Sequence, residues 1–354
     1  MFILRILLLP FSFLYGVVTF IRNTLFNTGL LKSKSFDTFS ISIGNITVGG
    51  TGKSPHVEYL IRLLKSSKKI ATLSRGYRRE STGFILADNN STYKDIGDEP
   101  MQFHSNFKDI TVAVDGNRRR GISNLEKEIN PDIILLDDCF QHRWIKPSLN
   151  IILLDYSTIG DKQFMLPSGE LREWKIGIKR ADIIIVSKSP NIYSPIENRR
   201  ITELINPNTH QKIFFSYIAY KEIVPFNNTA KQLFEKDDFS IKNFKVNVLA
   251  GIAKVDHLTD HLQIISKDVI LSEFNDHYAF KPADILGITN KFKEIISSDK
   301  ILITTEKDTM RLKDERLFPL LEEFPVFYLP IEIKFHKTSE DALTFDQTIL
   351  ENVQ

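Results

Sequence analysis

Cysteine is almost absent from this chain, since Cys139 is the only one among 354 residues. A single cysteine cannot form an intramolecular disulfide, so nothing indicates an oxidising compartment, and a reducing cytoplasm fits. A large net charge is lacking as well, because 46 Lys and Arg residues stand against 44 Asp and Glu residues. This balance argues against a nucleic-acid-binding protein steered by a broad positive field. We therefore expect no nucleic-acid partner, and no motif implies a protein partner.

Acidic residues are missing from the first 36 residues, which are rich in Leu, Ile and Phe and whose charged residues are all Lys or Arg. A signal peptide would need a small-residue cleavage site, and none of the A-x-A kind follows. For a transmembrane helix, the uncharged run from Ile6 to Ile21 is short, about 16 residues or roughly 24 Å against a bilayer core of about 30 Å. We predict an amphipathic helix that lies in the membrane interface. A helix packed on the protein's own core is the alternative.

Repeats and low-complexity tracts are also missing, and hydrophobic residues make up 42% of the chain, enough to fill two cores of ordinary size. After the N-terminal segment, short apolar runs rich in Ile and Val alternate with helical stretches. This alternation predicts an α/β fold with a mostly parallel sheet covered by helices on both faces. Around residues 211–245 the pattern gives way to extended and polar stretches, and a smaller second α/β domain follows. The apolar runs are DITVAV, DIILLD, NIILLD and ADIIIVS, and later KVNVLAGIA, DVILSEF and KILITT.

Residues 41–60 run from a β-branched strand through the glycine-rich loop TVGGTGKS into a helical pattern. This is the layout of a phosphate-binding P-loop, in which backbone N–H groups and the positive end of the helix surround phosphate oxygens. In such a loop Lys53 meets the β- and γ-phosphates of ATP, and the Ser54 hydroxyl meets Mg²⁺. The predicted nucleotide-binding residues are Thr47, Gly49, Gly50, Thr51, Gly52, Lys53 and Ser54.

The loop departs from the general pattern GxxxxGK[ST] at one residue. That pattern has glycine six residues before the lysine, where this chain has Thr47. A glycine-rich turn with an incidental lysine is the alternative. The order of strand, loop and helix favours the P-loop.

Two acids, Asp137 and Asp138, end the apolar run IILLD. In P-loop proteins an acid at the end of a neighbouring strand commonly holds Mg²⁺. Adjacent side chains on a strand point in opposite directions, so we predict that one acid serves the metal and the other orients the loop or a second ligand. A solvated strand end is the alternative. The predicted metal ligands are Ser54, Asp137 and Asp138.

Several further motifs join charged residues to turns. Asp98 lies in GDEP, which is preceded by a basic stretch that contains Arg75, and an adjacent pair, Asp276 and His277, follows a strand of the second domain. A phosphoryl acceptor needs a base and a polyphosphate needs cations. Taken one at a time, these motifs are also compatible with surface turns, and residues 118–120 with a solvated helix face. Two more motifs of this kind are PSGELRE and TTEKD.

Eight motifs between residues 47 and 308 resemble, in their residues and in their order along the chain, those of the tetraacyldisaccharide 4′-kinase, or lipid A 4′-kinase, family. In that family too, the first glycine of the general P-loop pattern is replaced, as it is by Thr47. This sequence differs from the family's usual pattern at Arg78 and Tyr278, neither of which we assign to chemistry. The motifs are TVGGTGKSP, SRGY, GDEP, LDDCFQHR, PSGELRE, GIAKVDH, NDHY and TTEKD.

The resemblance implies roles for individual residues. Asp98 is implied as the catalytic base and His277 as its support. Lys53 of the P-loop is the third predicted catalytic residue. The acids Asp137 and Asp138 are implied to lie around Mg²⁺ and the γ-phosphate. The resemblance also implies that Gln141, His142, Arg172 and Glu173 lie in the active-site cleft, and we predict Arg75 and Asp276 there as well.

The implied reaction is transfer of the ATP γ-phosphate to the 4′-hydroxyl of a tetraacyl glucosamine disaccharide 1-phosphate, a lipid A precursor, with ATP and Mg²⁺ as cofactors. The implied location is the membrane surface at the cytoplasmic face of the bacterial inner membrane. The predicted segments are a membrane-associating segment (1–35), a P-loop kinase domain (36–215), a smaller α/β domain (216–340) and a C-terminal tail (341–354).

Two other functions compete with this one. A P-loop ATPase switch of the partitioning or metal-delivery type also carries a GGxGK[ST] loop, but it has a signature lysine early in the loop, near where this chain has Val48. A non-enzymatic membrane adaptor would need only the N-terminal helix, with a vestigial P-loop. The intact Lys53, Ser54 and paired acids argue against such decay.

Overall fold

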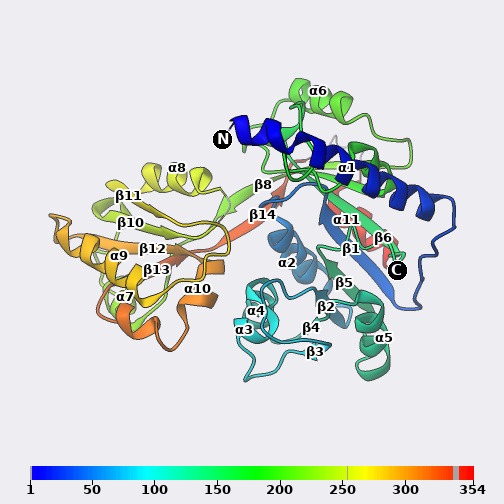
Figure 1. The fold of residues 1–354 in the computed structure, drawn as a ribbon. Helices are drawn as coiled ribbons and strands as arrows, with labels where there is room; N and C mark the ends of the chain where they lie inside the picture. Colours follow the sequence, from blue (N-terminus) through cyan, green and yellow to red (C-terminus); the bar gives the residue numbers. More distant parts are fainter. Residues whose placement is uncertain (1, 253, 338–342) are drawn as a thin grey trace. The chain divides into compact units, whose positions relative to one another are not determined.

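The computed structural model describes residues 2–252, 254–337 and 343–354, and the chain forms two compact units (Figure 1). Unit 1 comprises residues 1–219 and 333–354, and unit 2 comprises residues 220–332. Met1, Ala253 of the GIAKVDH motif and residues 341–342 of the predicted tail lie outside the described residues.

Unit 1 is built on a nine-stranded sheet with the strand order β14-β8-β7-β6-β1-β5-β2-β4-β3. The pairings from β8 to β4 are parallel, whereas the short edge strand β3 runs antiparallel to β4. Strands buried on both faces account for the Ile- and Val-rich runs of the sequence. The strands are β1 (Phe39–Asn45), β2 (Ile70–Ser74), β3 (Ile85–Leu86), β4 (Thr111–Val114), β5 (Ile133–Asp137), β6 (Leu149–Asp155), β7 (Ile183–Ser187), β8 (Lys212–Tyr220) and β14 (Ile331–Phe335).

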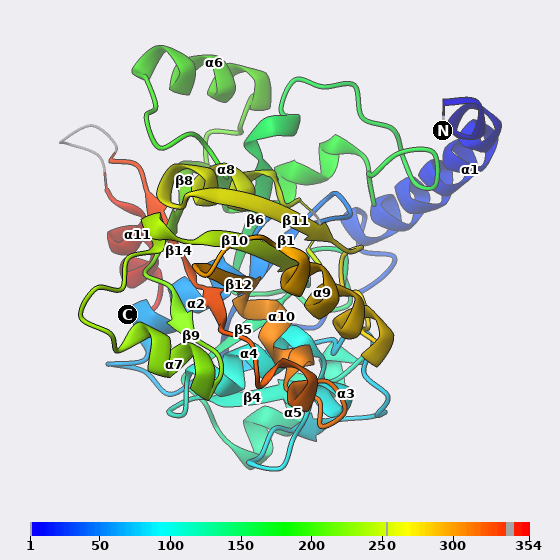
Figure 2. The same cartoon turned by 90° about the vertical axis from the view of Figure 1, so that its left-hand side faces the viewer.

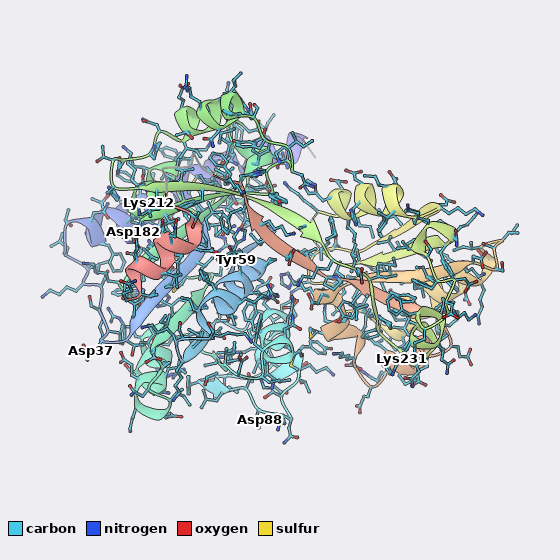
Figure 3. The ribbon with its side chains drawn as sticks, turned by 180° about the vertical axis from the view of Figure 1, so that it is seen from behind. Asp37, Tyr59, Asp88, Asp182, Lys212 and Lys231 are labelled. Carbon is cyan, nitrogen blue, oxygen red and sulfur yellow. The ribbon has the colours of Figure 1, made fainter. Side chains whose placement is uncertain are left out.

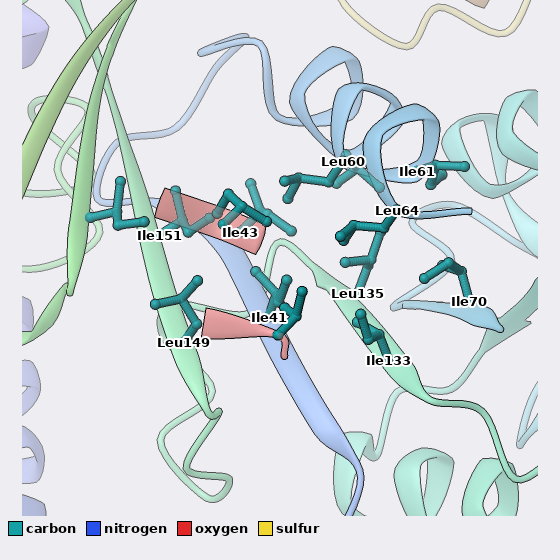
Figure 4. Close-up of a cluster of buried hydrophobic side chains, with 14 of the residues drawn as sticks. Ile41, Ile43, Leu60, Ile61, Leu64, Ile70, Ile133, Leu135, Leu149 and Ile151 are labelled. Carbon is teal, nitrogen blue, oxygen red and sulfur yellow. The ribbon is translucent and has the colours of Figure 1, made fainter. Parts of the chain in front are cut away.

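Helices cover both faces of this sheet, which confirms the predicted fold class. One face is covered by α2, α4 and α11, and the other by α5, α6 and the short helix η2. Figure 4 shows Leu60 and Leu64 of α2 packed against Ile41 and Ile43 of β1, all of them buried. This packing fixes α2 relative to the end of β1, where the glycine-rich loop lies. The helices are α1 (Phe2–Asn27), α2 (Lys53–Leu64), α3 (Tyr93–Ile96), α4 (Asp98–Asn106), α5 (Arg118–Glu128), η1 (Tyr156–Thr158), η2 (Lys175–Arg180), α6 (Pro195–Ile205) and α11 (Phe345–Asn352).

The C-terminal helix α11 completes the core on the α2 face. Its Phe345 and Ile349 are buried in the same cluster as the apolar side chains of α2. Tyr59 of α2, labelled in Figure 3, donates a hydrogen bond from its hydroxyl to Asp346 at 2.6 Å. The sequence alone suggested a tail here, whereas burial of one apolar face joins residues 343–354 to unit 1.

Helix α1 has two faces of different character. On one face Ser12 and Thr19 are buried, and Trp174 Nε1 donates a hydrogen bond to the Gly16 carbonyl at 2.9 Å. A Cβ atom at Gly16 would lie 2.7 Å from the Trp174 ring, so only glycine permits this close approach. The other face exposes large apolar side chains, whereas a helix that packs on a protein core buries them. These exposed residues include Leu7, Phe11, Phe13, Leu14, Val18, Phe20 and Ile21.

Unit 2 has a five-stranded sheet in the order β11-β10-β12-β13-β9, parallel except for β9. Helices α7 and α8 pack on one face of this sheet, and α9, α10 and η4 on the other (Figure 2). The strands are β9 (Val224–Pro225), β10 (Lys245–Ala250), β11 (Asp268–Glu273), β12 (Lys300–Thr305) and β13 (Val326–Leu329). The helices are α7 (Asn228–Phe234), η3 (Ile241–Asn243), α8 (Asp256–Ile265), α9 (Pro282–Glu294), α10 (Glu306–Leu312) and η4 (Phe318–Leu321).

Candidate active site

The glycine-rich loop joins β1 to α2, and its backbone explains where glycine is needed. Gly49 and Gly52 have φ angles of 100° and 85°, in the left-handed region that favours glycine. Thr47, in contrast, forms an antiparallel bridge with Leu171. A residue in this extended arrangement does not have to be glycine, so the departure from the general P-loop pattern at Thr47 has a structural reason.

Neighbouring side chains brace the loop. Asn45, the last residue of β1, donates a hydrogen bond to Thr51 Oγ1 at 2.9 Å and accepts one from Lys53 Nζ at 3.4 Å. From the end of β7, Ser187 Oγ donates a hydrogen bond to the Thr51 carbonyl at 2.9 Å. The loop is therefore held in its curved form by contacts within unit 1.

The two predicted acids lie at the end of β5, next to this loop. Asp138 has a φ of 47°, and its Oδ1 lies 3.7 Å from Lys53 Nζ and 2.9 Å from Arg172 Nη1. Burial by itself would raise the pKa of Asp138, but Lys53 and Arg172 hold that pKa below its ordinary value. Burial, and then the charge of Asp138, raises the pKa of Asp137. Asp137 Oδ2 accepts a hydrogen bond from Ser74 at 3.3 Å, and its buried Oδ1 has no partner within the described residues.

A chain of hydrogen bonds joins the loop to the PSGELRE segment. Gln141 Nε2 donates to the Asn45 carbonyl at 2.7 Å and to Glu173 Oε1 at 2.9 Å, while its Oε1 accepts from Arg172 Nη1 at 3.3 Å. Glu173 is fully buried and forms an ion pair with Arg180 at 2.8 Å. The structure thus brings five predicted residues into one network, namely Lys53, Asp138, Gln141, Arg172 and Glu173.

His142 and Arg118 lie close to the acids. Burial, with a further contribution from Arg118 and other cations, lowers the pKa of His142 to about 4, so this imidazole is neutral at pH 7. Arg118 is buried and donates hydrogen bonds to the carbonyls of Asp137 at 3.2 Å and Asp115 at 2.6 Å. Its Nε has no partner in the described part of the chain. Arg118 is therefore a buried cation behind the acids and not part of a solvated helix face.

Asp98 is the first residue of α4 and is buried. The preceding Gly97 has a φ of 93°, and a Cβ atom there would lie 3.2 Å from Gly76 Cα, so the GDEP and SRGY turns touch. Arg75, next to Gly76, is exposed and makes no hydrogen bond or ion pair within the described ranges. Asp98 is thus held at a tight turn, while Arg75 projects a cation from the neighbouring turn.

In unit 2, Asp276 and His277 follow β11 at the carboxyl end of the parallel strands. His277 has a φ of 55°, and its N–H donates a hydrogen bond to the Gly251 carbonyl at 3.2 Å. Asp276 Oδ2 lies 3.8 Å from His277 Nε2, which is too long for a hydrogen bond. Ligands of open parallel sheets bind at this end of the strands.

Three residues that brace the glycine-rich loop were not predicted from the sequence, namely Asn45, Asp155 and Lys188. Lys188 Nζ lies 3.3 Å from Asp155 Oδ2 and donates a hydrogen bond to the carbonyl of Gly50 in the loop. A signal for Asp155 was present, because the run IILLD occurs at residues 133–137 and again at residues 151–155. No pattern singled out Asn45, although it stands directly before the loop.

The groups around the loop fit a triphosphate and a hard divalent cation. Lys53 makes only long contacts, at 3.4 and 3.7 Å, and the Ser54 hydroxyl makes no hydrogen bond within the described residues. Together with the unpartnered Oδ1 of Asp137, these groups leave a cation for phosphate and oxygen ligands for Mg²⁺. A parallel sheet with this loop and these acids defines a P-loop nucleotide-binding protein.

Comparisons with known proteins give the particular family. The family model for tetraacyldisaccharide-1-P 4′-kinase matches residues 4–350. A tetraacyldisaccharide 4′-kinase of Parabacteroides distasonis is 43% identical over 351 residues, which cover 98% of this chain and 94% of the relative. Another, from Flavobacterium johnsoniae, is 42% identical over 357 residues, which cover 99% and 98%. The chain therefore belongs to the tetraacyldisaccharide 4′-kinase family.

A solved structure supports the same conclusion. The crystal structure of LpxK from Aquifex aeolicus, described as in complex with ATP, matches with a TM-score of 0.72 and 26% sequence identity. The match covers 99% of this chain and 100% of the other. The resemblance predicted from the eight motifs is confirmed, and the P-loop ATPase switch is not favoured.

Proposed function

We propose that this protein transfers the γ-phosphoryl group of ATP to the 4′-hydroxyl of a tetraacyl disaccharide 1-phosphate. It is a kinase of lipid A biosynthesis. The observation that carries this function is the family match over residues 4–350, together with relatives of that name at 43% and 42% identity across nearly the whole chain. The P-loop of unit 1 supplies the donor half of such a reaction.

The donor site of this proposal consists of residues that already lie together in unit 1. The amides of the glycine-rich loop and the Lys53 ammonium bind the phosphate oxygens of ATP. Ser54, Asp137 and Asp138 would hold Mg²⁺, which when bound neutralises charge on the β- and γ-phosphates. Arg172 holds Asp138 through its hydrogen bond at 2.9 Å. Positioning and electrostatic stabilisation supply most of the catalysis in phosphoryl transfer.

The acceptor half of the proposal rests on Asp98. A carboxylate that takes the proton of an attacking hydroxyl has to be held within hydrogen-bond reach of it. Asp98 is buried at the start of α4, where Gly97 and the neighbouring turn restrict its movement. In this proposal His277 of unit 2 supports Asp98 by donating a hydrogen bond to its carboxylate. The exposed Arg75 offers a cation to a phosphate of the nucleotide or of the lipid.

Helix α1 supports a membrane location for this reaction. By length and composition, residues Arg5–Asn27 are long and apolar enough to cross a membrane. The polar face of α1 contacts the site-bearing segment, where Tyr15 donates a hydrogen bond to the Arg172 carbonyl at 3.0 Å and Asn23 donates one to Glu173 at 3.0 Å. In the proposal the exposed apolar face enters the membrane interface on the cytoplasmic side of the inner membrane. A lipid head group is thereby presented close to the phosphate-binding network.

The function is tested by incubating the full-length protein with ATP, Mg²⁺ and the tetraacyl disaccharide 1-phosphate in mixed micelles. A parallel reaction omits the lipid. We expect a phosphate at the 4′-position and little ATP hydrolysis without the lipid. Hydrolysis that proceeds equally without lipid would indicate an ATPase, and no turnover under either condition would indicate a non-enzymatic adaptor. Either result overturns the proposal.

A further inference from the structure

The loop that carries His277 is fixed by a buried ion pair in unit 2. Asp308 lies in the first turn of α10 and is fully buried. Its Oδ2 accepts hydrogen bonds from the Gly251 N–H at 3.0 Å and from Thr305 Oγ1 at 2.6 Å, and its Oδ1 pairs with Arg311. The same ion pair therefore ties the end of β10 to the start of α10.

The partner of Asp308 extends this support to the loop after β11. Arg311 Nη1 donates a hydrogen bond to the Tyr278 carbonyl at 3.0 Å, directly after His277. The His277 N–H in turn donates to the Gly251 carbonyl. The segments that follow β10 and β12 thus hold the backbone around His277, which has a left-handed φ of 55°. A non-glycine residue is kept in this conformation only where the surrounding structure determines it.

Lys307, next to Asp308, contacts the His277 side chain itself. Its Nζ lies 3.0 Å from His277 Nε2 and 3.7 Å from Asp276 Oδ1. An ammonium group has three donors and no acceptor. The lysine is therefore the donor and Nε2 the acceptor. In a neutral imidazole that accepts at Nε2, the proton lies on Nδ1.

We propose that Lys307 is a positioning residue that sets the tautomer of His277, so that the imidazole offers an Nδ1–H donor. Asp276 does not fix a proton on Nε2, because its Oδ2 is 3.8 Å away. The significance for catalysis rests on the proposed function: an ionised carboxylate only accepts hydrogen bonds, so a histidine that supports Asp98 has to present a donor. The contacts from which we infer the tautomer, those of His277 with Lys307 and Asp276, lie within unit 2.

The tautomer can be read directly from the nitrogen resonances of the imidazole. Full-length protein labelled with ¹⁵N-histidine is recorded in detergent micelles at neutral pH, and His277 is assigned as the signals that His277→Gln removes. We expect a protonated Nδ1 and an unprotonated Nε2 in the wild type. Lys307→Met should move the proton to Nε2 or produce a mixture of tautomers. Lys231→Met, at an exposed lysine of α7 labelled in Figure 3, should change nothing.

Kinetics provide the second measurement. Lys307→Met should lower kcat by about tenfold, the size of one charge-assisted hydrogen bond, and leave KM for ATP within about twofold. Lys307→Arg, which keeps a cationic donor, should retain more activity than the methionine variant.

Two results would overturn the proposal: a wild-type His277 protonated at Nε2, or an unchanged tautomer in Lys307→Met. If that variant does not fold, the wild-type spectrum still decides. A wild-type protein that fails to phosphorylate the lipid would count against the proposed function, while its spectrum would still report on Lys307.

Discussion

The two units both place charged side chains at the carboxyl ends of their parallel strands, but they differ in how completely a buried carboxylate there is paired. In unit 1, Asp137 keeps a buried oxygen without a partner in the described residues, and Lys53 reaches its neighbours only at 3.4 and 3.7 Å. In unit 2, both oxygens of Asp308 are occupied, by Arg311 on one side and by Thr305 and a backbone N–H on the other.

This difference separates two uses of buried charge. A buried polar atom without a partner costs free energy, and when it belongs to an acid beside a phosphate-binding loop it points to a ligand that completes the site. A buried charge whose partners are all supplied by the protein instead holds loops together, and it becomes costly only when one partner is removed. We therefore expect substitution of Asp137 to affect activity more than stability, and substitution of Asp308 to do the reverse.

The largest effect is expected at the proposed base of unit 1. Asp98→Ala should lower kcat for the lipid acceptor by about two to four powers of ten, because the acceptor hydroxyl loses its base. The measurement is a steady-state kinase assay at saturating ATP. Asp88→Ala, at the exposed aspartate labelled in Figure 3, is the matched control and should retain full activity. A loss of less than about threefold for Asp98→Ala would remove this residue from the role.

The next effect concerns the paired charge of unit 2. Asp308→Ala leaves Arg311 buried without its carboxylate and should lower the free energy of unfolding by about 3–5 kcal/mol. Urea denaturation followed by circular dichroism measures this change. Asp268→Ala breaks an exposed pair with Lys245 and should cost less than about 1 kcal/mol. Equal costs for the two variants would contradict the structural role of Asp308.

Asp137→Asn tests whether the incompletely paired acid of unit 1 serves ligand binding and not stability. Activity should fall by about two to three powers of ten, since the site loses a charge that it uses for its ligand. Stability should be unchanged or slightly higher, because burial raises the pKa of Asp137 and disfavours its ionised form in the folded protein. Kinase rates and urea denaturation of the same samples check both parts. A destabilisation as large as that of Asp308→Ala would show that the two acids serve the same structural purpose.

The free energy of unfolding is expected to depend on pH through His56, which lies in α2 just after the P-loop. Burial lowers the pKa of His56 from 6.5 to about 4, and its ring contacts the Gly52 carbonyl and Ser216. As the pH falls, the His56 imidazole takes up a proton in the unfolded chain before it does so in the folded protein. The contribution of His56 to the free energy of unfolding is therefore fully present above about pH 6.5 and declines toward pH 4, by about 3 kcal/mol in total.

Urea denaturation between about pH 4 and pH 7 measures this dependence. In His56→Gln the free energy of unfolding should depend less on pH, by the contribution of His56. His210→Gln, at an exposed histidine, should leave it as it is. A steep decline that persists unchanged in His56→Gln would assign the effect to other groups.

The smallest effect is expected on the exposed face of α1. Phe11 is 64% exposed, and Phe11→Ser should weaken binding to anionic vesicles by about tenfold, because less apolar area enters the interface. Vesicle co-sedimentation measures this, and the melting temperature should stay constant. Ile296→Ser, at a side chain 95% exposed in unit 2, is the control. Equal vesicle binding by Phe11→Ser and the wild type would count against this face as the membrane contact.

Features that depend on neighbours in the sequence could be predicted. The glycine-rich loop between a strand and a helix, and the acids at the end of an apolar run, follow from the periodicity and from the chemistry of phosphate binding. Long-range contacts could not be predicted. The network that joins Gln141, Arg172 and Glu173 to the loop, and the burial of Arg118, depend on strands brought together by the sheet order.

The sequence by itself determined the family, the P-loop and the acids beside it, because each is a local arrangement of residue types that phosphate chemistry requires. Only the tertiary structure decided which charges are satisfied. Whether Asp137 keeps an unpartnered oxygen, whether Asp308 is fully paired, and which nitrogen of His277 faces Lys307 depend on atoms far apart in the chain. Such contacts arise when parallel strands align their carboxyl ends, and hydrogen bonding acts over distances that only folding sets.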